Sequence, residues 1–175
     1  MFKKSLDKID YLVLNTYMNS MFMEAGKMKI SSKGRYALAS MILLAQNTQE
    51  GSPLTVIGIS ERLDISKIYL EQVFALLRRG GLVTSIKGAQ GGYQLARQAS
   101  DISAADILSV TENSIFEPVE ATVKDMAPGI ERALTDMLWV PANKALHNVF
   151  ERMPLSELAE EAIRKSSEDS YMYCI

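Results

Sequence analysis

A helix that stops at two glycines and is followed at once by a hairpin constrains the fold of this chain more than any other feature. The stretch is IYLEQVFALLRRGGLVTSIKGAQGGYQLA, residues 68–96. Its first half places apolar residues on one helical face: Leu70, Val73, Phe74 and Leu77. Gly80 and Gly81 supply the left-handed residue that ends a helix. Two β-prone runs, LVTSI and YQLA, flank the loop KGAQGG, which predicts a two-stranded ribbon beside the end of the helix.

Two helices are predicted before this stretch. From Ser31 or Ser32, either of which can cap, KGRYALASMILLAQN has apolar residues at helical spacing: Leu38, Met41, Ile42 and Ala45. After the break TQEGSP, Thr55 caps the short helix VIGISERL. DIS is a tight turn, and Ser66 is the predicted N-cap of the helix described above.

The second half of the chain is predicted to be mainly helical. DISAADILSVTE forms a short helix with Ser103 and Asp106 in capping-box positions, and FEPVEATVKDMAPG is a loop. IERALTDMLWVPANKALHNVFERM is a long helix with a nearly continuous apolar stripe, which Pro141 should kink or divide. Ser156 caps a last helix, ELAEEAIRKS, before a frayed tail.

The net charge of −2 hides a division of charge along the chain. Residues 28–97 contain nine Lys or Arg and four Asp or Glu, whereas residues 98–175 contain six and fourteen. A basic segment joined to an acidic one indicates that one half attracts a polyanion and the other avoids it. Chance asymmetry on solvated faces is the alternative explanation.

Composition narrows the class of protein. The 175 residues, 47% of them apolar, suffice for one domain or two small ones with a real core. No apolar run approaches the roughly 20 residues needed to cross a bilayer. The first 27 residues faintly resemble a secretory signal, but Asp7, Asp10 and Asn15 interrupt the apolar part and no Ala-x-Ala-like site follows. The single cysteine, Cys174, excludes an internal disulfide and fits a reducing cytosol, so we expect a cytoplasmic protein.

The order of elements is that of a winged helix-turn-helix, a mainly α fold with a small β-wing. A helix fits the roughly 12 Å major groove of B-DNA, and its neighbouring ribbon can lie over phosphates or enter the minor groove. Glycines at the wing tip remove steric bulk, and Lys87 supplies charge. Winged helices also serve as protein-interaction modules, but the basic charge of this block favours nucleic acid.

Four motifs carry a resemblance to a known family: MKISSKGRYAL, YLEQVFALLRRGGLV, IKGAQGGYQLA and ISAADILSVTE. In order and spacing, from Met28 to about Glu112, they closely resemble the Rrf-two family of bacterial winged-helix repressors. Beyond Glu112 the resemblance is looser, with Leu138 and Trp139 in a setting similar to the family's dimerisation helix. Residues 1–27 lie outside it, so Met28 is the predicted ancestral start. The resemblance implies a homodimeric transcription regulator, more often a repressor, with one winged helix on each half-site of a near-palindromic operator.

The resemblance also implies roles for single residues. In the family the helix that opens with Ser66 is the recognition helix, and the predicted base-reading residues are Ser66, Ile68, Glu71 and Gln72. Glutamate can accept from cytosine N4, and glutamine can pair with adenine. The predicted contacts to the DNA backbone or minor groove are Lys29, Lys33, Arg35, Lys67, Tyr69, Lys87, Gly88, Gly91 and Gly92. Lys87 stands where the family often has arginine, so minor-groove reading should be weaker here. The predicted dimerisation stripe is Ile130, Leu134, Met137, Leu138, Ala142, Ala145 and Val149.

Several relatives hold an iron–sulfur cluster with cysteines in the loop before the long helix. The matching stretch, IFEPVEATVKDMAPGIERAL, has no cysteine, and Cys174 alone cannot replace three thiolate ligands. His147, the one histidine, falls on a stripe expected to be mostly buried and is predicted to be structural. We therefore expect no metal and no cofactor, as in the cluster-free branch represented by CymR, which acts through a protein partner of the cysteine-synthesis pathway.

No enzyme signature is present, because KGAQGG lacks the Lys-Ser/Thr and the strand-to-helix setting of a phosphate loop. The predicted divisions are an extension of uncertain order at 1–27, a winged-helix DNA-binding domain at 28–97, a linker with dimerisation or regulatory helices at 98–165, and a tail at 166–175. Two alternatives remain open. One is a protein-interaction adaptor that no longer binds DNA, and the other is a cluster-binding redox or nitric-oxide sensor with atypical ligands.

Overall fold

The computed structural model describes residues 30–47, 52–88, 91–112, 115–117 and 120–172. The first elements are α2 (Ser32–Asn47), α3 (Val56–Leu63), α4 (Lys67–Arg79), β1 (Val83–Ile86), β2 (Gly92–Leu95), a 3₁₀ turn η2 (Ala99–Asp101) and α5 (Ala104–Thr111). They are followed by α6 (Pro128–Leu134), a π-helical turn η3 (Thr135–Trp139), α7 (Val140–Glu151) and α8 (Leu155–Met172). The predicted mainly α fold with a small β-wing is confirmed.

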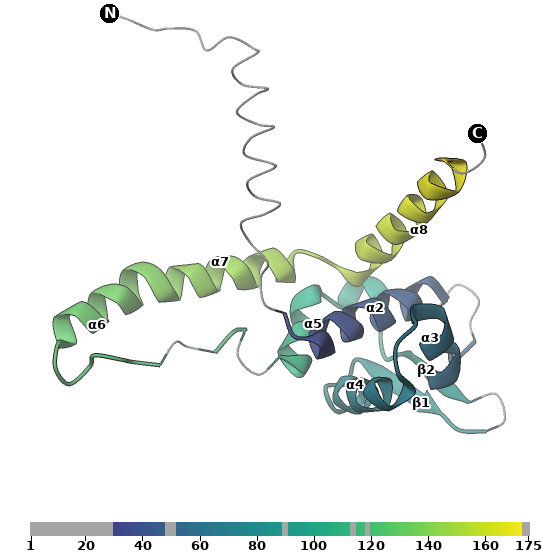
Figure 1. Cartoon of the computed structure of the whole chain (residues 1–175), viewed down its shortest axis with the longest axis horizontal. Coiled ribbons are helices and arrows are strands. Elements are labelled where there is room, and N and C mark those ends of the chain that lie inside the picture. The colour runs from purple at the N-terminus through teal and green to yellow at the C-terminus, as the bar shows by residue number, and fades with distance from the viewer. Residues whose placement is uncertain (1–29, 48–51, 89–90, 113–114, 118–119, 173–175) are drawn as a thin grey trace, which may run out of the picture.

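The helices α2 to α5 and the ribbon gather into one body, from which the α6–α7 helix and the far half of α8 project (Figure 1). The centre of that body is formed by the predicted inner face of α4, whose four apolar residues are fully buried: Leu70, Val73, Phe74 and Leu77. Ile102, Ile107 and Leu155 close the core from the side of α5 and α8. Within the described ranges, no helix is long and apolar enough to cross a membrane.

The buried side of α2 differs from the predicted stripe. Met41 is buried as expected, but Ala37 and Leu44 are its buried neighbours. Leu38, Ile42 and Ala45 are only partly buried. The reason is that α2 is covered by α4, α5 and α8 together, so its buried face is centred one position earlier than the apolar spacing suggests.

Most of the predicted helix starts are confirmed. Thr55 Oγ1 accepts from the Gly58 N–H at 3.0 Å, and Ser31 Oγ accepts from the Gly34 N–H at 3.2 Å. Ser103 and Asp106 form the reciprocal capping box, at 3.1 and 2.9 Å. These caps depend on residues three positions apart, which the sequence shows directly.

Two predictions at helix ends need correction, and a third holds in position only. Ser66 occupies the N-cap position of α4, but its side chain makes no cap hydrogen bond. Ser156 lies inside α8, because the helix already starts at Leu155, whose N–H donates to the Ile102 carbonyl at 2.7 Å. The same helix continues through Met172, past residue 165, where the sequence predicts a tail.

The predicted interruption of the long helix at Pro141 takes the form of a π-helical turn, which separates α6 from α7. The backbone runs from α6 through η3 into α7, and the Val140 N–H donates to the Thr135 carbonyl, five residues back. A π-helical turn of this kind changes the hydrogen-bonding register just before proline, which has no N–H to donate. The helix therefore absorbs Pro141 as a local π-bulge.

Candidate nucleic-acid interface

The helix α4 presents one face to the core and the other to solvent. Opposite the buried residues lie the exposed side chains of its first two turns: Lys67, Ile68, Tyr69, Glu71 and Gln72. The alternation follows from the helical spacing of apolar and polar residues in this segment. All four predicted base-reading residues, including Ser66 just before the helix, are exposed together at its N-terminal end.

The turn between α3 and α4 fixes the direction in which α4 leaves. Asp64 adopts the left-handed conformation at φ 51°, and its N–H donates to the Ser60 carbonyl. The Ser60 hydroxyl donates to the Ile65 carbonyl at 2.6 Å, while the Ile65 side chain is buried. Aspartate tolerates positive φ better than most residues, so this short turn is locally encoded.

Two contacts hold the side chains at the start of α4. The Tyr69 ring meets the Tyr36 ring of α2 edge to face, with 5.8 Å between centroids and 88° between planes. On the other side, Lys67 Nζ lies 3.7 Å from Glu71 Oε1. Tyr69 thus packs against α2 and remains half exposed.

The Tyr36–Tyr69 contact also places the first turn of α2 next to the first turn of α4. Arg35 immediately precedes Tyr36, and Lys33 lies in the same turn. The Arg35 guanidinium is anchored by a hydrogen bond to Ser32 Oγ at 3.2 Å. These two predicted phosphate contacts therefore lie close to the recognition helix, whereas Lys29 falls outside the described residues.

A long-range contact secures that same corner of the molecule. Glu112, which follows α5, accepts from the Ser31 N–H at 3.0 Å and from the Ser31 hydroxyl at 2.6 Å. A Cβ on Gly34 would lie 2.2 Å from Glu112 Oε1, so the carboxylate fits only because residue 34 is glycine. This clasp was not predicted, since its partners are 81 residues apart in the sequence.

The wing is fixed beside α4 by an additional β-bridge between Leu54 and the strand β2. The strands β1 and β2 are antiparallel, and Leu54 adds a bridge in which it exchanges two backbone hydrogen bonds with Tyr93, at 2.8 and 2.9 Å. The Tyr93 ring packs on Phe74 of α4, with 4.4 Å between centroids. The direction of the wing is therefore set by the core and by the segment before α3.

The wing glycines are needed for different reasons. A Cβ on Gly92 would lie 2.4 Å from the Leu54 carbonyl oxygen, and one on Gly91 would lie 2.5 Å from the Ile86 carbonyl oxygen. Packing within the protein therefore accounts for these two glycines, which the sequence assigned to close approach of DNA. Gly88 has φ +120° and open space around it. It lies next to the exposed Lys87, near the wing tip, so these two residues keep the predicted setting.

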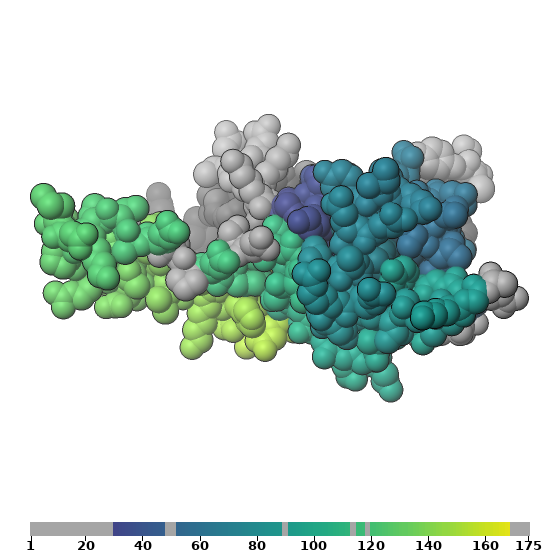
Figure 2. Space-filling model, turned by 90° about the horizontal axis from the view of Figure 1, so that it is seen from below, coloured from purple at the N-terminus to yellow at the C-terminus, as the bar shows by residue number. Residues whose placement is uncertain are grey.

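The helix α4 and the ribbon lie along the same lower edge of the body in Figure 1, and α4 contacts β1. Figure 2, seen from below relative to Figure 1, looks onto this edge, and the long helix protrudes to the other side. Arg78 and Arg79 add positive charge in the last turn of α4. This face offers a helix, a ribbon and several cations to an elongated polyanion.

The long helix leaves most of its predicted dimerisation stripe uncovered. Ile130, Met137, Leu138 and Val149 are exposed, Ala142 and Ala145 are exposed as well, and Leu134 is half-buried. The side chain of His147 is about half exposed, contrary to its expected burial. Its ring stacks edge-on against Phe116, and its Nδ1 lies 3.7 Å from Glu151 Oε2.

The loop before the long helix is closed by a carboxylate. Glu131 is 8% exposed, and its Oε2 accepts from the N–H groups of Thr122 and Val123, both at 3.0 Å. Asn143 of α7 donates to the Glu117 carbonyl at 3.3 Å. No described cluster of three or more His, Cys, Asp or Glu side chains is placed to hold a metal ion. The sequence of this loop has no cysteine, and its buried carboxylate already accepts two backbone hydrogen bonds.

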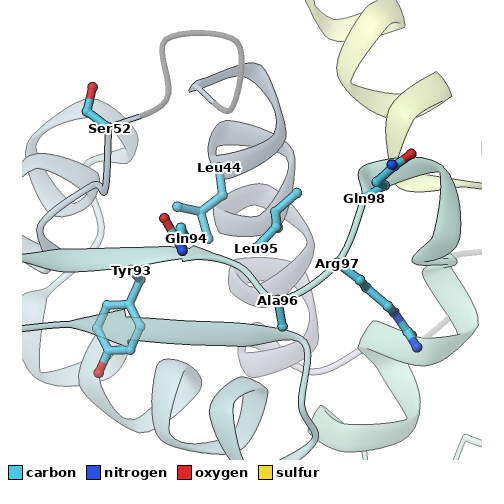
Figure 3. Close-up of a pocket in the computed structure, with 8 residues that line it drawn as sticks. All are labelled: Leu44, Ser52, Tyr93, Gln94, Leu95, Ala96, Arg97 and Gln98. Atoms are coloured by element: carbon cyan, nitrogen blue, oxygen red, sulfur yellow. The ribbon is translucent and has the colours of Figure 1, made fainter.

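A hollow of about 300 Å³ lies on the other side of the ribbon. Figure 3 shows that two of its larger lining residues point away from it: Tyr93 toward the far side of the ribbon, and Arg97 toward α5. There Arg97 Nη2 lies 3.0 Å from Asp106 Oδ2. The remaining lining residues are uncharged: Leu44, Ser52, Gln94, Leu95, Ala96 and Gln98. The hollow therefore gives little basis for binding a charged effector.

Comparison with known proteins decides the family. The Rrf2 model, described as an iron-dependent transcriptional regulator, matches residues 30–161. The chain belongs to the Rrf2 family. This is the family that the four sequence motifs resemble, so that prediction is confirmed. As the family and its relatives indicate, the protein is a transcriptional regulator and not an enzyme.

The relatives agree in sequence and in structure. The HTH-type transcriptional regulator IscR of Xenorhabdus nematophila is 38% identical over 133 residues, which cover 76% of this chain and 80% of IscR. The structure of CymR, the global cysteine regulator of B. subtilis, superposes with a TM-score of 0.64 at 37% identity, covering 77% of this chain and 98% of CymR. T. potens IscR follows with a TM-score of 0.61 at 36% identity, covering 78% and 89%.

Proposed function

We propose that this Rrf2 protein is a sequence-specific DNA-binding regulator that acts as a homodimer on a near-palindromic operator. The observation that carries the proposal is the common face formed by the N-terminal end of α4, the wing and the first turn of α2. Each of these elements suits a different part of a duplex. The helix fits the major groove, the wing can reach the adjacent minor groove, and the cations of α2 can meet phosphates.

Within this face we assign base reading to Ser66, Ile68, Glu71 and Gln72. Ser66 supports this role because its hydroxyl makes no cap bond and is exposed. Glu71 can accept from cytosine N4, and Gln72 can pair with adenine. Lys67 lies beside Glu71 and can also reach a phosphate of the DNA. Its positive charge would then offset the repulsion between the Glu71 carboxylate and the DNA backbone.

Contacts to phosphates or to the minor groove are assigned to Lys33, Arg35, Tyr69, Lys87 and Gly88, and Lys29 is assigned with them on its sequence position. With Lys67 of α4, the described cations lie in α2, in α4 and just after β1, so they can follow the curved DNA backbone on both sides of the recognition helix. Such contacts fix register without reading sequence.

The partner in the homodimer is proposed to cover the exposed stripe of the long helix. Ile130, Met137, Leu138 and Val149 leave an apolar surface on a helix that projects from the body (Figure 1). A contiguous apolar surface of this kind is typical of an interface. A two-fold pair of long helices would set two recognition helices at half-sites of opposite orientation.

Repression and the absence of a cluster are further parts of the proposal. A dimer that covers two half-sites near a promoter would exclude RNA polymerase. In a purified transcription assay, adding the protein should therefore lower the amount of transcript made from a template that carries the operator. The chemistry of the 115–131 segment supports a cluster-free protein, as argued above. Anaerobic purification should give a colourless protein without iron, and an absorbance band with bound iron would refute this part.

We infer that the signal reaching this regulator is a protein, such as an enzyme of cysteine synthesis. The support is the similarity to CymR, whose structure is described as that of a global cysteine regulator, together with a loop that lacks cluster ligands. Adding a purified cysteine-synthesis enzyme should change the affinity for DNA. An unchanged affinity over a range of enzyme concentrations would refute this choice of partner.

The experiment that tests the main proposal is equilibrium binding to a labelled duplex carrying the upstream region of the protein's own gene. A regulator should prefer this duplex to a scrambled one of equal length by about 10³-fold or more. Equal affinity for both would leave only non-specific binding. No affinity for either would favour the protein-interaction adaptor instead.

A further inference from the structure

We propose that Ile68 selects a thymine in each half-site by packing against the 5-methyl group of that base. This inference rests on the proposed function, and it goes further by naming one base and the group through which it is recognised. Thymine is the base that presents a methyl group in the major groove, beside its O4 acceptor. An apolar side chain therefore distinguishes it from cytosine at the same position.

Ile68 points more directly away from the core than its neighbours do. At 100° per residue, the buried residues Leu70 and Leu77 lie on the opposite side of α4 from Ile68. Its side chain is 69% exposed, more than any other large apolar side chain described between residues 30 and 112. This exposure, on the side of α4 opposite the core, leaves the side chain available for an apolar contact outside the protomer.

Its position along the helix suits a base edge. Ile68 is the second residue of α4, and the N-terminal residues of a recognition helix are those that contact bases. Gln72, one turn later, lies on the same exposed face and can read the adjacent base pair. An apolar contact and an amide hydrogen bond would then alternate along one strand of the groove.

The side chains next to Ile68 leave it free for this contact, and its own branched shape limits its rotamers. Tyr69 is packed on Tyr36, and Lys67 is near Glu71, so the side chains on both sides are directed elsewhere. Isoleucine is β-branched and has essentially one favoured χ1 rotamer in a helix. The side chain is therefore ordered before DNA arrives, and little conformational entropy is lost on contact.

The expected effect is modest and measurable. Burying one methyl group changes affinity by about fourfold, so replacing thymine by uracil at this position should weaken binding about fourfold in one half-site. Replacing it in both half-sites of a two-fold operator should weaken binding by about 15-fold. Uracil pairs with adenine as thymine does, so the hydrogen-bonding edge of the base pair is unchanged.

The test is a scan of uracil for thymine along an operator selected from random duplex DNA. Binding is measured for the unsubstituted protein and for the variants Ile68→Ala and Ile57→Ala, all of full length. Ile57 is a matched control because it is another exposed isoleucine, 54% accessible, but it lies on α3. Thermal unfolding of each variant should show that both remain folded, since neither side chain is in the core.

The expected result is one uracil-sensitive position in each half-site, lost in Ile68→Ala and retained in Ile57→Ala. The inference is wrong if uracil at no position weakens binding by the unsubstituted protein, or if Ile68→Ala keeps the same uracil-sensitive position. The proposed DNA-binding function is unaffected by either result. If Ile68→Ala binds DNA normally but loses a protein partner, Ile68 is a protein contact and the inference is also wrong. If the full-length protein selects no DNA at all, the proposed function itself fails.

Discussion

Replacing Lys87 by alanine should make DNA binding less sensitive to salt by a predictable amount. Each phosphate neutralised by the protein contributes about −0.9 to the slope of log affinity against log salt concentration. The described face carries four proposed phosphate contacts: Lys33, Arg35, Lys67 and Lys87. If all four act in both protomers of a dimer, the slope is about −7.

Lys87→Ala removes two of these contacts from the dimer, so its slope should be shallower by about 1.8. The wing should remain folded, because the ribbon is held by the Leu54–Tyr93 pairing and by the contact of Tyr93 with Phe74, not by Lys87. Affinity should therefore fall by a similar factor for every sequence, without a change in the preferred one.

The assay is fluorescence anisotropy of a labelled operator between about 50 and 200 mM salt. Lys144→Ala is the matched control: it removes one exposed lysine on α7, which has no place on the proposed DNA face. Its slope should equal that of the unchanged protein. An unchanged slope in Lys87→Ala, or an equal change in Lys144→Ala, would show that the wing does not meet the phosphate backbone.

Three further variants test other parts of the account. Glu71→Ala should relax preference at one base pair, measured on a panel of single-substitution operators; a uniform loss on all of them would contradict base reading. Leu138→Glu should shift the protein from dimer to monomer in sedimentation velocity, because it puts a charge in the exposed apolar stripe; a persistent dimer would place the interface elsewhere. Gly92→Ala should lower the free energy of unfolding by about 1–3 kcal/mol, since its Cβ would meet the Leu54 carbonyl oxygen, whereas Gly129→Ala, in open space, should unfold as before.

Local spacing accounts for what the sequence predicted correctly. The inner face of α4, the Thr55 cap and the Ser103–Asp106 capping box all depend on residues within a turn or two of each other. Their partners are determined before any tertiary contact forms. The same holds for the recognition-helix residues, which are exposed because they lie opposite that inner face.

Long-range contacts account for most of what could not be predicted. Nothing in the sequence pairs Glu112 with Ser31, or Leu54 with Tyr93, because these contacts exist only once α5 and the ribbon have packed. In the sequence, Gly92 looks like a wing-tip residue. The structure shows that a glycine is needed there because a Cβ would collide with the Leu54 carbonyl oxygen.

The long helix shows a third kind of limit. Proline inside a helical pattern indicates disruption, but it does not say whether the helix kinks, breaks or takes up a π-turn. The apolar stripe likewise predicts a buried face without stating which molecule buries it. His147 was expected to be buried for this reason, and it is exposed because the protomer alone does not cover the helix.

The claim on which the account depends is that two copies of the winged helix read a duplex through its grooves. Selection of bound sites from a random duplex library by the purified full-length protein tests it most directly. A two-fold pair of winged helices should select an inverted repeat whose half-site centres lie one helical turn, about 10 base pairs, or a multiple of it apart. A selected pool with no sequence enriched above the starting library would contradict it.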